Sequence, residues 1–311
     1  MDFLKEFTSR WLSGEDTFTV HTSGSTGIPK DITILRSDME HSAGATNAHF
    51  AITEKSRLGS PLSAAYIAGK MMVVRACIAG AELVPLEVSN SFTLPDGTFD
   101  LLPIVPSMIP NLLENPSWAA RIKNVLIGGA QPAKSSLLAL HQAGYNFWIS
   151  YGMTETCSHV ALAQLDGIYH AMPGVSFNTD NRGCLIVNAP GYSWKTLTTN
   201  DAVELLSQSS FRWLGRIDGV INSGGIKLFP EELERLYEPF LTGDFAVTSR
   251  PSERWGQEVV LVTTMDPEQA NEILKANIPG IKQPKAIVHN AGLPRTPNGK
   301  IDRKALGTLV L

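Results

Sequence analysis

Cysteine is scarce in this chain of 311 residues, which contains only three. Cys77, Cys157 and Cys184 lie far apart in the sequence and form no CxxC pair, so they indicate neither a disulfide framework nor a zinc-binding cysteine site. The seven histidines form no HxxxH or HExxH pair, which argues against metal ligation by imidazole. We therefore expect three reduced, partly buried thiols.

Long apolar runs and blocks of like charge are also missing. The first residues, MDFLKEFTSRW, contain no uninterrupted apolar stretch, and the most apolar later segment, residues 64–86, is interrupted by Lys70, Arg75 and Glu82. We expect a cytoplasmic chain without a membrane span. The 26 Lys and Arg residues against 30 Asp and Glu residues give a formal net charge of -4, which predicts no general attraction to nucleic acid or to an anionic membrane.

What the sequence does contain is an alternation of short apolar runs with helical patterns. Segments with helical spacing cover residues 37–51, where Ser37, Asp38 and Glu40 signal the start of a helix, and residues 132–144, where Gly144 signals a stop. Strands that alternate with helices favour an α/β domain. The runs that we interpret as strands are DTFTVHTSG, SRLGSPLS, AELVPLEV, KNVLIGGA, YNFWISYG and RGCLIVNAP.

The composition changes near residue 215. A glycine-rich turn is followed by a helix that begins at Pro230 with two glutamates in its first turn, as the helix dipole favours. Two strands, DFAVTSRP and EVVLVTTMD, then precede a helix, PEQANEILKANI, and a last strand, PKAIVHNAGL. We predict two domains, a large one over residues 1–215 and a small α+β domain over residues 216–311.

One stretch, HTSGSTGIPKD at residues 21–31, combines small, hydroxyl and basic side chains. In a glycine-rich turn the backbone N–H groups converge on phosphate oxygens, hydroxyls add donors and a lysine adds positive charge. The stretch is not a Walker A loop, because Pro29 stands where that motif requires glycine and Asp31 follows Lys30 where it requires Ser or Thr. Taken alone, it fits a phosphate-binding loop and a solvated hairpin connection equally well.

Four further motifs follow this stretch in order: YGMTE at residues 151–155, LTTND ending at Asp201, GRIDGVINSGGIKLFPEELE beginning at Gly215, and PRTPNGKIDRKAL near the C-terminus. Together with the first stretch, which has the form [S/T]SG[S/T]TGxPK, they resemble the acyl-adenylate-forming superfamily. This superfamily includes the acyl-CoA synthetases, the adenylation domains of peptide synthetases and the luciferases. The resemblance implies a large N-terminal α/β domain followed by a smaller, mobile C-terminal α+β domain.

The activity implied by the resemblance is the ATP-dependent activation of a carboxylic acid. The acid attacks the α-phosphorus of ATP to give an acyl adenylate, and the thiol of coenzyme A then displaces AMP. An anionic acid that approaches a triphosphate needs Mg²⁺, positive side chains and oriented amides. The resemblance assigns the phosphates to the first loop, whose residues are Thr22, Ser23, Gly24, Ser25, Thr26, Gly27 and Lys30.

The YGMTE motif supplies further nucleotide contacts by the same resemblance. Glu155 offers the oxygen ligand that Mg²⁺ prefers, and Thr154 is expected to donate to the α-phosphate. Tyr151, followed by Gly152, offers a flat face to adenine. A solvated charge for Glu155 and a core position for Tyr151 are the alternatives.

Glycines and one further acidic residue complete the expected nucleotide site. The run Gly128, Gly129 and Ala130 lets the backbone approach the nucleotide or the acyl group closely, although a simple turn explains it as well. Asp201 is the natural acceptor for the ribose hydroxyls, and the superfamily pairs it with an arginine that corresponds to Arg216.

The small domain is expected to serve both steps of the reaction. Lys300 lies in the C-terminal motif, where the superfamily uses a lysine to neutralise charge between the carboxylate and the α-phosphate. A surface lysine is the alternative, which the flanking PRTPNGK makes less favoured. Asp218 corresponds to a hinge near residues 216–218, about which the small domain rotates for the second step. The residues then expected near coenzyme A are Ser223, Gly224, Gly225 and Lys227.

The choice of acid is expected to depend on the region between the first loop and YGMTE. Here Tyr66 stands where small-acid ligases commonly have histidine, which is a departure from the superfamily pattern. The sequences YGMTETCSH and VLIGGAQP, together with Arg75, are most similar to the ligases that act on o-succinylbenzoate in menaquinone biosynthesis. Because that acid has a second carboxylate, Arg75, Lys70 and His159 are candidates to bind it, and each is equally readable as a packing residue.

Members of the superfamily usually have a much longer region before the phosphate loop. The chain is therefore expected to be a compact ligase, for which a homo-oligomer is one way to complete the acid pocket, or a fragment. Three activities remain open: a ligase with coenzyme A, an adenylating enzyme that transfers another aryl or fatty acid or uses a carrier-protein thiol, and a truncated nucleotide-binding protein without ligase activity.

Overall fold

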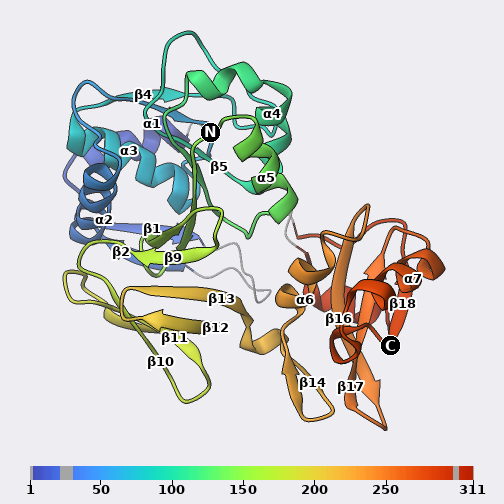
Figure 1. Ribbon diagram of the computed structural model, residues 1–311. Coiled ribbons are helices and arrows are strands. Elements are labelled where there is room, and N and C mark those ends of the chain that lie inside the picture. Colours follow the sequence, from blue (N-terminus) through green and yellow to red (C-terminus); the bar gives the residue numbers. More distant parts are fainter. Residues whose placement is uncertain (1–2, 22–30, 297–300, 311) are drawn as a thin grey trace.

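A mixed sheet of nine described strands forms the larger part of the structure (Figure 1). The computed structural model describes residues 3–21, 31–296 and 301–310. The strand order is β10-β11-β12-β13-β9-β8-β7-β6-β5, in which β5, β6 and β7 are parallel and the other neighbours are antiparallel. The strands are β5 (Leu102–Ile104), β6 (Val125–Ile127), β7 (Phe147–Gly152), β8 (His159–Ala163), β9 (Ile168–Ala171), β10 (Ser176–Thr179), β11 (Cys184–Ala189), β12 (Lys195–Ser207) and β13 (Ser210–Arg216).

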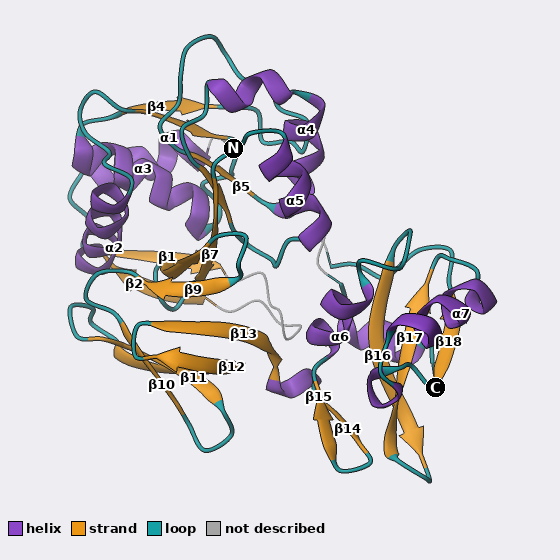
Figure 2. Cartoon of the chain, in the orientation of Figure 1, coloured by secondary structure: helices purple, strands orange, loops and turns teal. Residues whose placement is uncertain are grey.

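Strands β5 and β6 are short and entirely apolar because both of their faces are covered. Every residue of β5 and β6 is buried, as is typical of parallel strands between layers of helices. In Figure 2 the helices α1, α2 and α3 lie on one side of these strands, and α4 and α5 lie on the other. The helices are α1 (Phe3–Leu12), α2 (Arg36–His49), α3 (Ile67–Ala79), α4 (Ile109–Glu114) and α5 (Lys134–Gln142), with short 3-10 turns η1 (Pro106–Met108) and η2 (Pro116–Ala120).

Two smaller strand pairs complete this part of the chain. Strands β1 (Thr17–His21) and β2 (Asp31–Leu35) are antiparallel, and their register places His21 opposite Asp31. The phosphate-loop candidates therefore connect the ends of two adjacent strands. Strands β3 (Arg57–Ser60) and β4 (Glu82–Pro85) are parallel and are joined through α3.

A separate sheet is built from the last third of the chain. Its order is β15-β14-β17-β16, and β18 pairs in parallel with β17. The strands are β14 (Ile221–Ser223), β15 (Ile226–Leu228), β16 (Phe245–Ser252), β17 (Gly256–Thr263) and β18 (Ala286–His289); the helices are α6 (Pro230–Tyr237), α7 (Pro267–Asn277) and α8 (Arg303–Thr308), with 3-10 turns η3 (Ile217–Gly219) and η4 (Gly280–Lys282).

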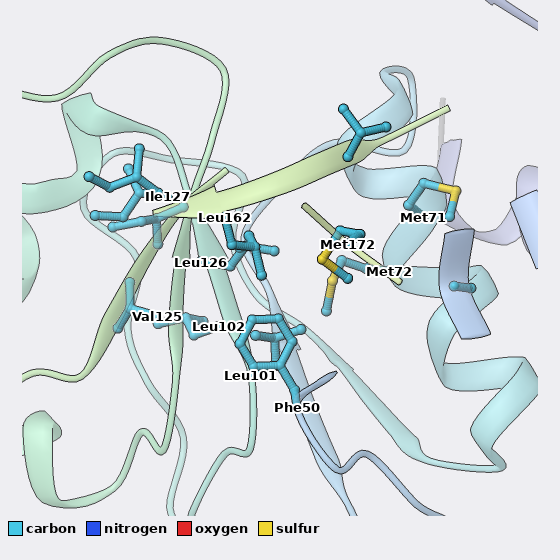
Figure 3. Packing of buried hydrophobic residues seen from close by; sticks show 14 of the residues in the cluster. Phe50, Met71, Met72, Leu101, Leu102, Val125, Leu126, Ile127, Leu162 and Met172 are labelled. Atoms are coloured by element: carbon cyan, nitrogen blue, oxygen red, sulfur yellow. The ribbon is translucent and has the colours of Figure 1, made fainter. Parts of the chain in front are cut away.

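The buried apolar residues form one large cluster in the first part of the chain and two small clusters in the last part. The large cluster extends from Phe7 to Phe211 and includes the side chains labelled in Figure 3. The two small clusters begin only at Ile221. The apolar packing of the two parts therefore changes from one cluster to the others between Phe211 and Ile221. The predicted domain boundary at residues 215 and 216 falls in this interval. Whether the two parts behave as mobile domains stays a prediction.

The predicted alternation of strands and helices is confirmed. Each of the six apolar runs contains a strand, and the two helical patterns form α2 and α5. The glycine expected to stop the second helix, Gly144, has a φ of 84°, a left-handed conformation that glycine adopts without strain. Among the described helices we find none with the length and apolar composition to cross a bilayer.

The helix predicted to start at Ser37 and Asp38 is present, but neither side chain caps it. Helix α2 begins at Arg36, and its cap residue Leu35 makes no side-chain capping hydrogen bond. The Asp38 carboxylate instead accepts hydrogen bonds from the amide and the hydroxyl of Ser193, at 2.8 and 2.5 Å, and it is buried. A contact with a residue far along the chain has therefore replaced the local cap.

Candidate active site

Residues 153–158 form a tight turn that connects β7 to β8. The register pairs Gly152 with His159, so the chain reverses direction within this turn. The fully buried Thr156 hydroxyl accepts from the Met153 amide at 2.9 Å and donates to the Ser158 carbonyl at 2.7 Å. A β-carbon at Gly152 would lie 2.1 Å from that carbonyl oxygen, so only glycine fits there.

The turn presents the predicted residues Thr154 and Glu155 next to the ends of the parallel strands. Glu155 is exposed, and within the described residues its carboxylate has no hydrogen bond or ion pair. Thr156, by contrast, was not predicted. The sequence gives no sign of its function, since it acts by satisfying backbone groups whose positions depend on the fold.

Glu155 fits the expected Mg²⁺ as a single ligand. Mg²⁺ typically keeps several waters and takes one or two carboxylates together with substrate phosphates. An exposed carboxylate without a protein partner meets that need. The part of the chain that the structure describes contains no cluster of three His, Cys, Asp or Glu residues, so the remaining ligands would be phosphate and water.

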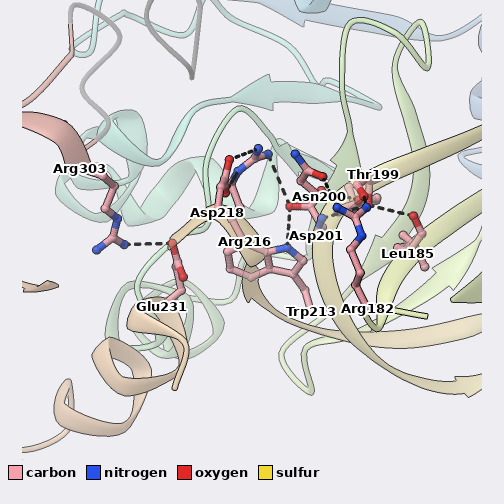
Figure 4. Close-up of polar contacts among 11 residues, drawn as sticks. Arg182, Leu185, Thr199, Asn200, Asp201, Trp213, Arg216, Asp218, Glu231 and Arg303 are labelled. Carbon is pink, nitrogen blue, oxygen red and sulfur yellow. Dashed lines mark hydrogen bonds and ion pairs between the residues drawn. The ribbon is translucent and has the colours of Figure 1, made fainter. Parts of the chain in front are cut away.

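Asp201 accepts hydrogen bonds from two aromatic side chains, one of which, Trp213, is seen in Figure 4. The Tyr151 hydroxyl donates to Oδ2 at 2.7 Å, and the Trp213 indole nitrogen donates to Oδ1 at 3.2 Å. Strands β12 and β13 place Asp201 directly opposite Arg216, whose Nη1 lies 3.9 Å from Oδ1. The pairing of these two residues that the resemblance implied is therefore present.

Arg216 also reaches the hinge candidate. Its guanidinium donates to both carboxylate oxygens of Asp218, at 3.0 and 2.8 Å, and this hydrogen bonding raises the pKa of Arg216 above its ordinary value. One guanidinium thus links the expected ribose acceptor to the start of the second sheet.

Tyr151 lies inside an aromatic group at the centre of the sheet. Its ring makes edge contacts with Tyr169 and Phe211, with centroids 5.7 and 5.1 Å apart. Burial, followed by the neighbouring Asp201 carboxylate, holds the pKa of the Tyr151 hydroxyl well above its usual range. The hydroxyl therefore stays protonated and donates, and an adenine contact through the ring stays a prediction.

The glycine run at the end of β6 packs against β7. A β-carbon on Gly128 would lie 2.8 Å from the Ser150 hydroxyl oxygen, and Gly129 has a φ of 86°. Gly129 and Ala130 are exposed. At Gly128 the group that approaches the backbone closely is therefore Ser150 of the neighbouring strand β7. Gly129 and Ala130 remain open to a ligand.

Arg75 of α3 is buried, with 2% of its surface exposed, and has no acidic partner among the described residues. Its Nη2 donates to the Ser158 hydroxyl at 2.8 Å, its Nη1 contacts the Met72 sulfur at 3.4 Å, and its Nε is buried without a hydrogen bond. Burial lowers the pKa of Arg75 to about 10. Because an uncompensated buried charge is costly, this position favours an anion.

His159 continues a chain of hydrogen bonds from Arg75. Its Nε2 lies 3.2 Å from the Thr46 hydroxyl, which itself donates to the Ser42 carbonyl, so we assign the ring proton to Nε2. Its Nδ1 then accepts from Ser158, 3.4 Å away. The chain of hydrogen bonds ends on a neutral carbonyl, and within the described part of the structure the buried Asn47 Oδ1 has no hydrogen-bond donor. The predicted pair of Arg75 and His159 is thus brought together.

The other two candidates of the acid region lie apart from this pair. Tyr66 is half exposed at the start of α3, nine residues before Arg75, or about 14 Å along the helix axis. Lys70 is buried, and its ammonium group donates to the carbonyls of Ala64 and Ala65. Lys70 therefore holds the preceding loop.

The glycine turn of the second sheet has the expected form. Gly224 and Gly225 have φ values of 58° and 82° and connect β14 to β15, as in hairpin turns that need two left-handed residues. The Gly224 amide donates to the Trp255 carbonyl at 2.9 Å, and a β-carbon there would meet the indole ring. Ser223 is buried and Lys227 is exposed.

Two predicted groups lie outside the described residues: Thr22 to Lys30 of the first loop, and Lys300. The segments that flank Lys300 are described. Arg295 forms an isolated bridge with Ile301, and the Asp302 amide donates to the Pro294 carbonyl at 2.9 Å.

Comparison with known proteins gives a family match over residues 5–191, to the family described as AMP-binding enzyme. The 2-succinylbenzoate–CoA ligase of Listeria monocytogenes is 26% identical over 95% of this chain and 70% of its own length. Among solved structures, an acyl-CoA synthetase (AMP-forming)/AMP-acid ligase II-like protein from Dyadobacter fermentans has 32% identity and a TM-score of 0.65, over 98% of this chain and 92% of that one.

A second solved structure supports the fold. The o-succinylbenzoate CoA synthetase of Bacillus subtilis, in complex with its acyl-adenylate intermediate, has a TM-score of 0.79 over 93% of this chain and 68% of that one. Its identity of 21% is informative about the fold alone.

Protonation of His159 is predicted to make folding stability fall in mild acid. Burial, then the charge of Arg75 and then His49, hold the pKa of His159 well below its usual range. Below the unfolded pKa of about 6.5, the unfolded chain binds a proton that the folded chain does not. Stability is therefore fully present above that pH and is lost as the pH falls toward the folded pKa, by up to about 2 kcal/mol at pH 5.

The measurement is the free energy of unfolding in urea at pH 7.5 and pH 5. His159→Gln should reduce the difference between the two values, whereas His170→Gln, at an exposed position on β9, should not. An equal pH dependence in wild type and His159→Gln would contradict a neutral, buried His159.

Proposed function

Because this chain belongs to the family of AMP-binding enzymes and is an AMP-forming acid–CoA ligase, we propose that its acid is o-succinylbenzoate and that it serves menaquinone biosynthesis. The observation that carries the choice of acid is the buried Arg75 without an acidic partner. o-Succinylbenzoate has two carboxylates, so one can be activated while the other balances the Arg75 charge. The name of the Listeria relative supports the same choice.

The position of Arg75 suits this assignment. Its hydrogen bond to Ser158 connects it to the turn that carries Thr154 and Glu155. A substrate carboxylate bound to Arg75 would therefore lie next to the turn that is assigned to the α-phosphate and Mg²⁺. Burial lowers the pKa of His159 and keeps its ring neutral, so Arg75 is the charged member of this pair. Tyr66, exposed at the other end of α3, is proposed to contact the acid only at the mouth of its site.

The first step transfers the adenylyl group to the acid. The activated carboxylate attacks the α-phosphorus of ATP, the bond to the bridging oxygen breaks and pyrophosphate leaves. We assign the ribose hydroxyls to Asp201 with Arg216, adenine to Tyr151 with Gly152 and Gly128 to Ala130, and the α-phosphate to Thr154. When bound to Glu155, Mg²⁺ would neutralise phosphate charge. The loop from Thr22 to Lys30 is assigned to the outer phosphates, and Lys300 to the developing charge at the α-phosphate.

The second step forms the thioester. The thiol of coenzyme A attacks the acyl carbonyl of the adenylate, and AMP leaves. We propose that the part of the chain after Asp218 turns about this residue between the two steps, and that the glycine turn with Ser223 and Lys227 then lies beside the thiol. The oligomeric state and a cytoplasmic location stay predictions.

The first test is acid-dependent exchange of pyrophosphate with ATP, catalysed by the purified protein with Mg²⁺. o-Succinylbenzoate is expected to support exchange, while benzoate, short and medium fatty acids and other aryl acids support little. Exchange with another of these acids only would keep the adenylation and remove the proposed substrate. Binding of ATP without exchange for any acid would favour a truncated nucleotide-binding protein. Transfer of the acyl group to a carrier-protein thiol in place of coenzyme A would favour an adenylating enzyme that serves a carrier protein.

Replacement of Arg75 tests the assignment of the second carboxylate. Arg75→Met keeps most of the buried volume and removes a charge that costs energy when unpaired, so the protein should remain folded. The preference for o-succinylbenzoate over 4-oxo-4-phenylbutyrate, which lacks the ring carboxylate, should fall by about tenfold to a hundredfold in kcat/KM, as expected for a charge-assisted hydrogen bond.

Lys70→Met provides a matched control for this experiment, because Lys70 is a buried cation on the same helix whose ammonium group binds backbone carbonyls. It should leave the preference for the dicarboxylate unchanged. An unchanged preference in Arg75→Met would place the second carboxylate elsewhere.

Replacement of Lys300 separates catalysis from simple nucleotide binding. Lys300→Ala should slow exchange by about a hundredfold to a thousandfold, the typical loss when one charge-stabilising group is removed. AMP affinity, measured by calorimetry, should change little, because the lysine is assigned to the reacting phosphate. Lys304→Ala, on α8, is the control and should retain exchange. Full exchange in Lys300→Ala would remove this lysine from the mechanism.

A further inference from the structure

Each of the two oxygens of the Asp201 carboxylate accepts one hydrogen bond from an aromatic side chain. Oδ2 accepts from the Tyr151 hydroxyl and Oδ1 accepts from the Trp213 indole N–H, while Arg216 approaches Oδ1 only to 3.9 Å. An ionised carboxylate oxygen has two lone-pair positions, so each oxygen keeps one position free. Two free positions on one carboxylate match the two neighbouring hydroxyls of a ribose.

The Trp213 indole is fixed from its other side by helix α6. The Arg235 guanidinium lies over the ring, with its central carbon 5.4 Å from the centroid. Its Nη2 also donates to the backbone carbonyls of Trp213 and Leu214, at 3.2 and 2.9 Å. Backbone and ring are thus both held, and the indole N–H has little freedom to turn away from Asp201 (Figure 4).

We propose that Trp213 is a positioning residue, which orients the Asp201 carboxylate so that its two free lone pairs accept the 2′- and 3′-hydroxyls of the nucleotide ribose. This inference rests on the proposed role of Asp201 as the ribose acceptor. Without the indole donor, Oδ1 would keep, among the described residues, only its long ion pair with Arg216. The carboxylate could then rotate about its χ2 angle, which is a broad torsion.

A purely structural role for Trp213 has a different signature. A buried indole usually finds a partner for its N–H whether or not a ligand is involved, so its loss would then weaken the binding of every nucleotide alike. Positioning of Asp201 affects only ligands that carry ribose hydroxyls. The discriminating quantity is therefore the ratio of the dissociation constants for 2′,3′-dideoxy-AMP and AMP.

The test uses calorimetry with these two ligands on the full chain. Trp213→Phe keeps an aromatic ring for Arg235 and removes the N–H. We expect the wild type to prefer AMP, and Trp213→Phe to lower this preference about threefold to tenfold, the loss expected for one hydrogen bond. In the exchange assay the KM for ATP should rise while kcat changes little. Trp213→Tyr, which also lacks the indole N–H, replaces Trp213→Phe if the latter folds poorly.

Trp148→Phe is the matched control, because Trp148 on β7 also donates its indole N–H to a side-chain oxygen, that of Asn124 at 3.3 Å. Its preference for AMP should equal that of the wild type. Equal weakening of both ligands in Trp213→Phe, or an unchanged preference, would overturn the inference alone. A wild type without preference for AMP would overturn the role of Asp201 as well. Neither result depends on the identity of the acid.

Discussion

The change of pairing direction at β7 is the constraint on which the arrangement of the site depends. Strand β7 pairs in parallel with β6 and antiparallel with β8, so the chain must reverse within the six residues of the turn 153–158. A turn this tight leaves backbone groups that must find partners. Thr156 satisfies them from a fully buried position, and Gly152 allows the two strands to approach. Thr154 and Glu155 are thereby placed beside the ends of the parallel strands, where ligands of open α/β sheets commonly bind.

Among the described residues, charge is paired around the expected ribose position and unpaired at Arg75. Asp201, Arg216 and Asp218 form a continuous set of contacts in which each charge has an opposite neighbour. Arg75 has none, and the hydrogen bonds that lead away from it pass through Ser158 and His159 to neutral groups. The charges at the ribose end of the site are therefore balanced without a ligand, whereas the charge of Arg75 is not. This asymmetry is the physical basis for assigning a dicarboxylate to the enzyme.

The sequence predicts the elements well because their signals are local, and it predicts side-chain contacts poorly because those depend on the fold. Apolar runs and glycine stops correctly indicated the strands and α5. The signal at Asp38 correctly indicated the start of α2, but it could not reveal that Ser193 donates two hydrogen bonds to the Asp38 carboxylate. The motifs located Glu155, Asp201 and Arg75, but neither Thr156 nor Trp213 stands out in a sequence. Both act on groups that only strand register brings within reach.

The two parts of the chain make contacts both near Asp218 in the sequence and farther from it. Near it, a β-carbon on Gly215 would lie 2.5 Å from a Glu231 carboxylate oxygen, and burial raises the pKa of Glu231. Farther away, Glu238 accepts from the amides of Lys134 and Ser135 at the exposed start of α5. Exposed contacts of this kind typically contribute at most about 1 kcal/mol. A rotation about Asp218, as proposed for the second step, would have to break the contact of Glu238 with the start of α5. Because this contact is exposed, breaking it costs little, and the rotation can be reversible.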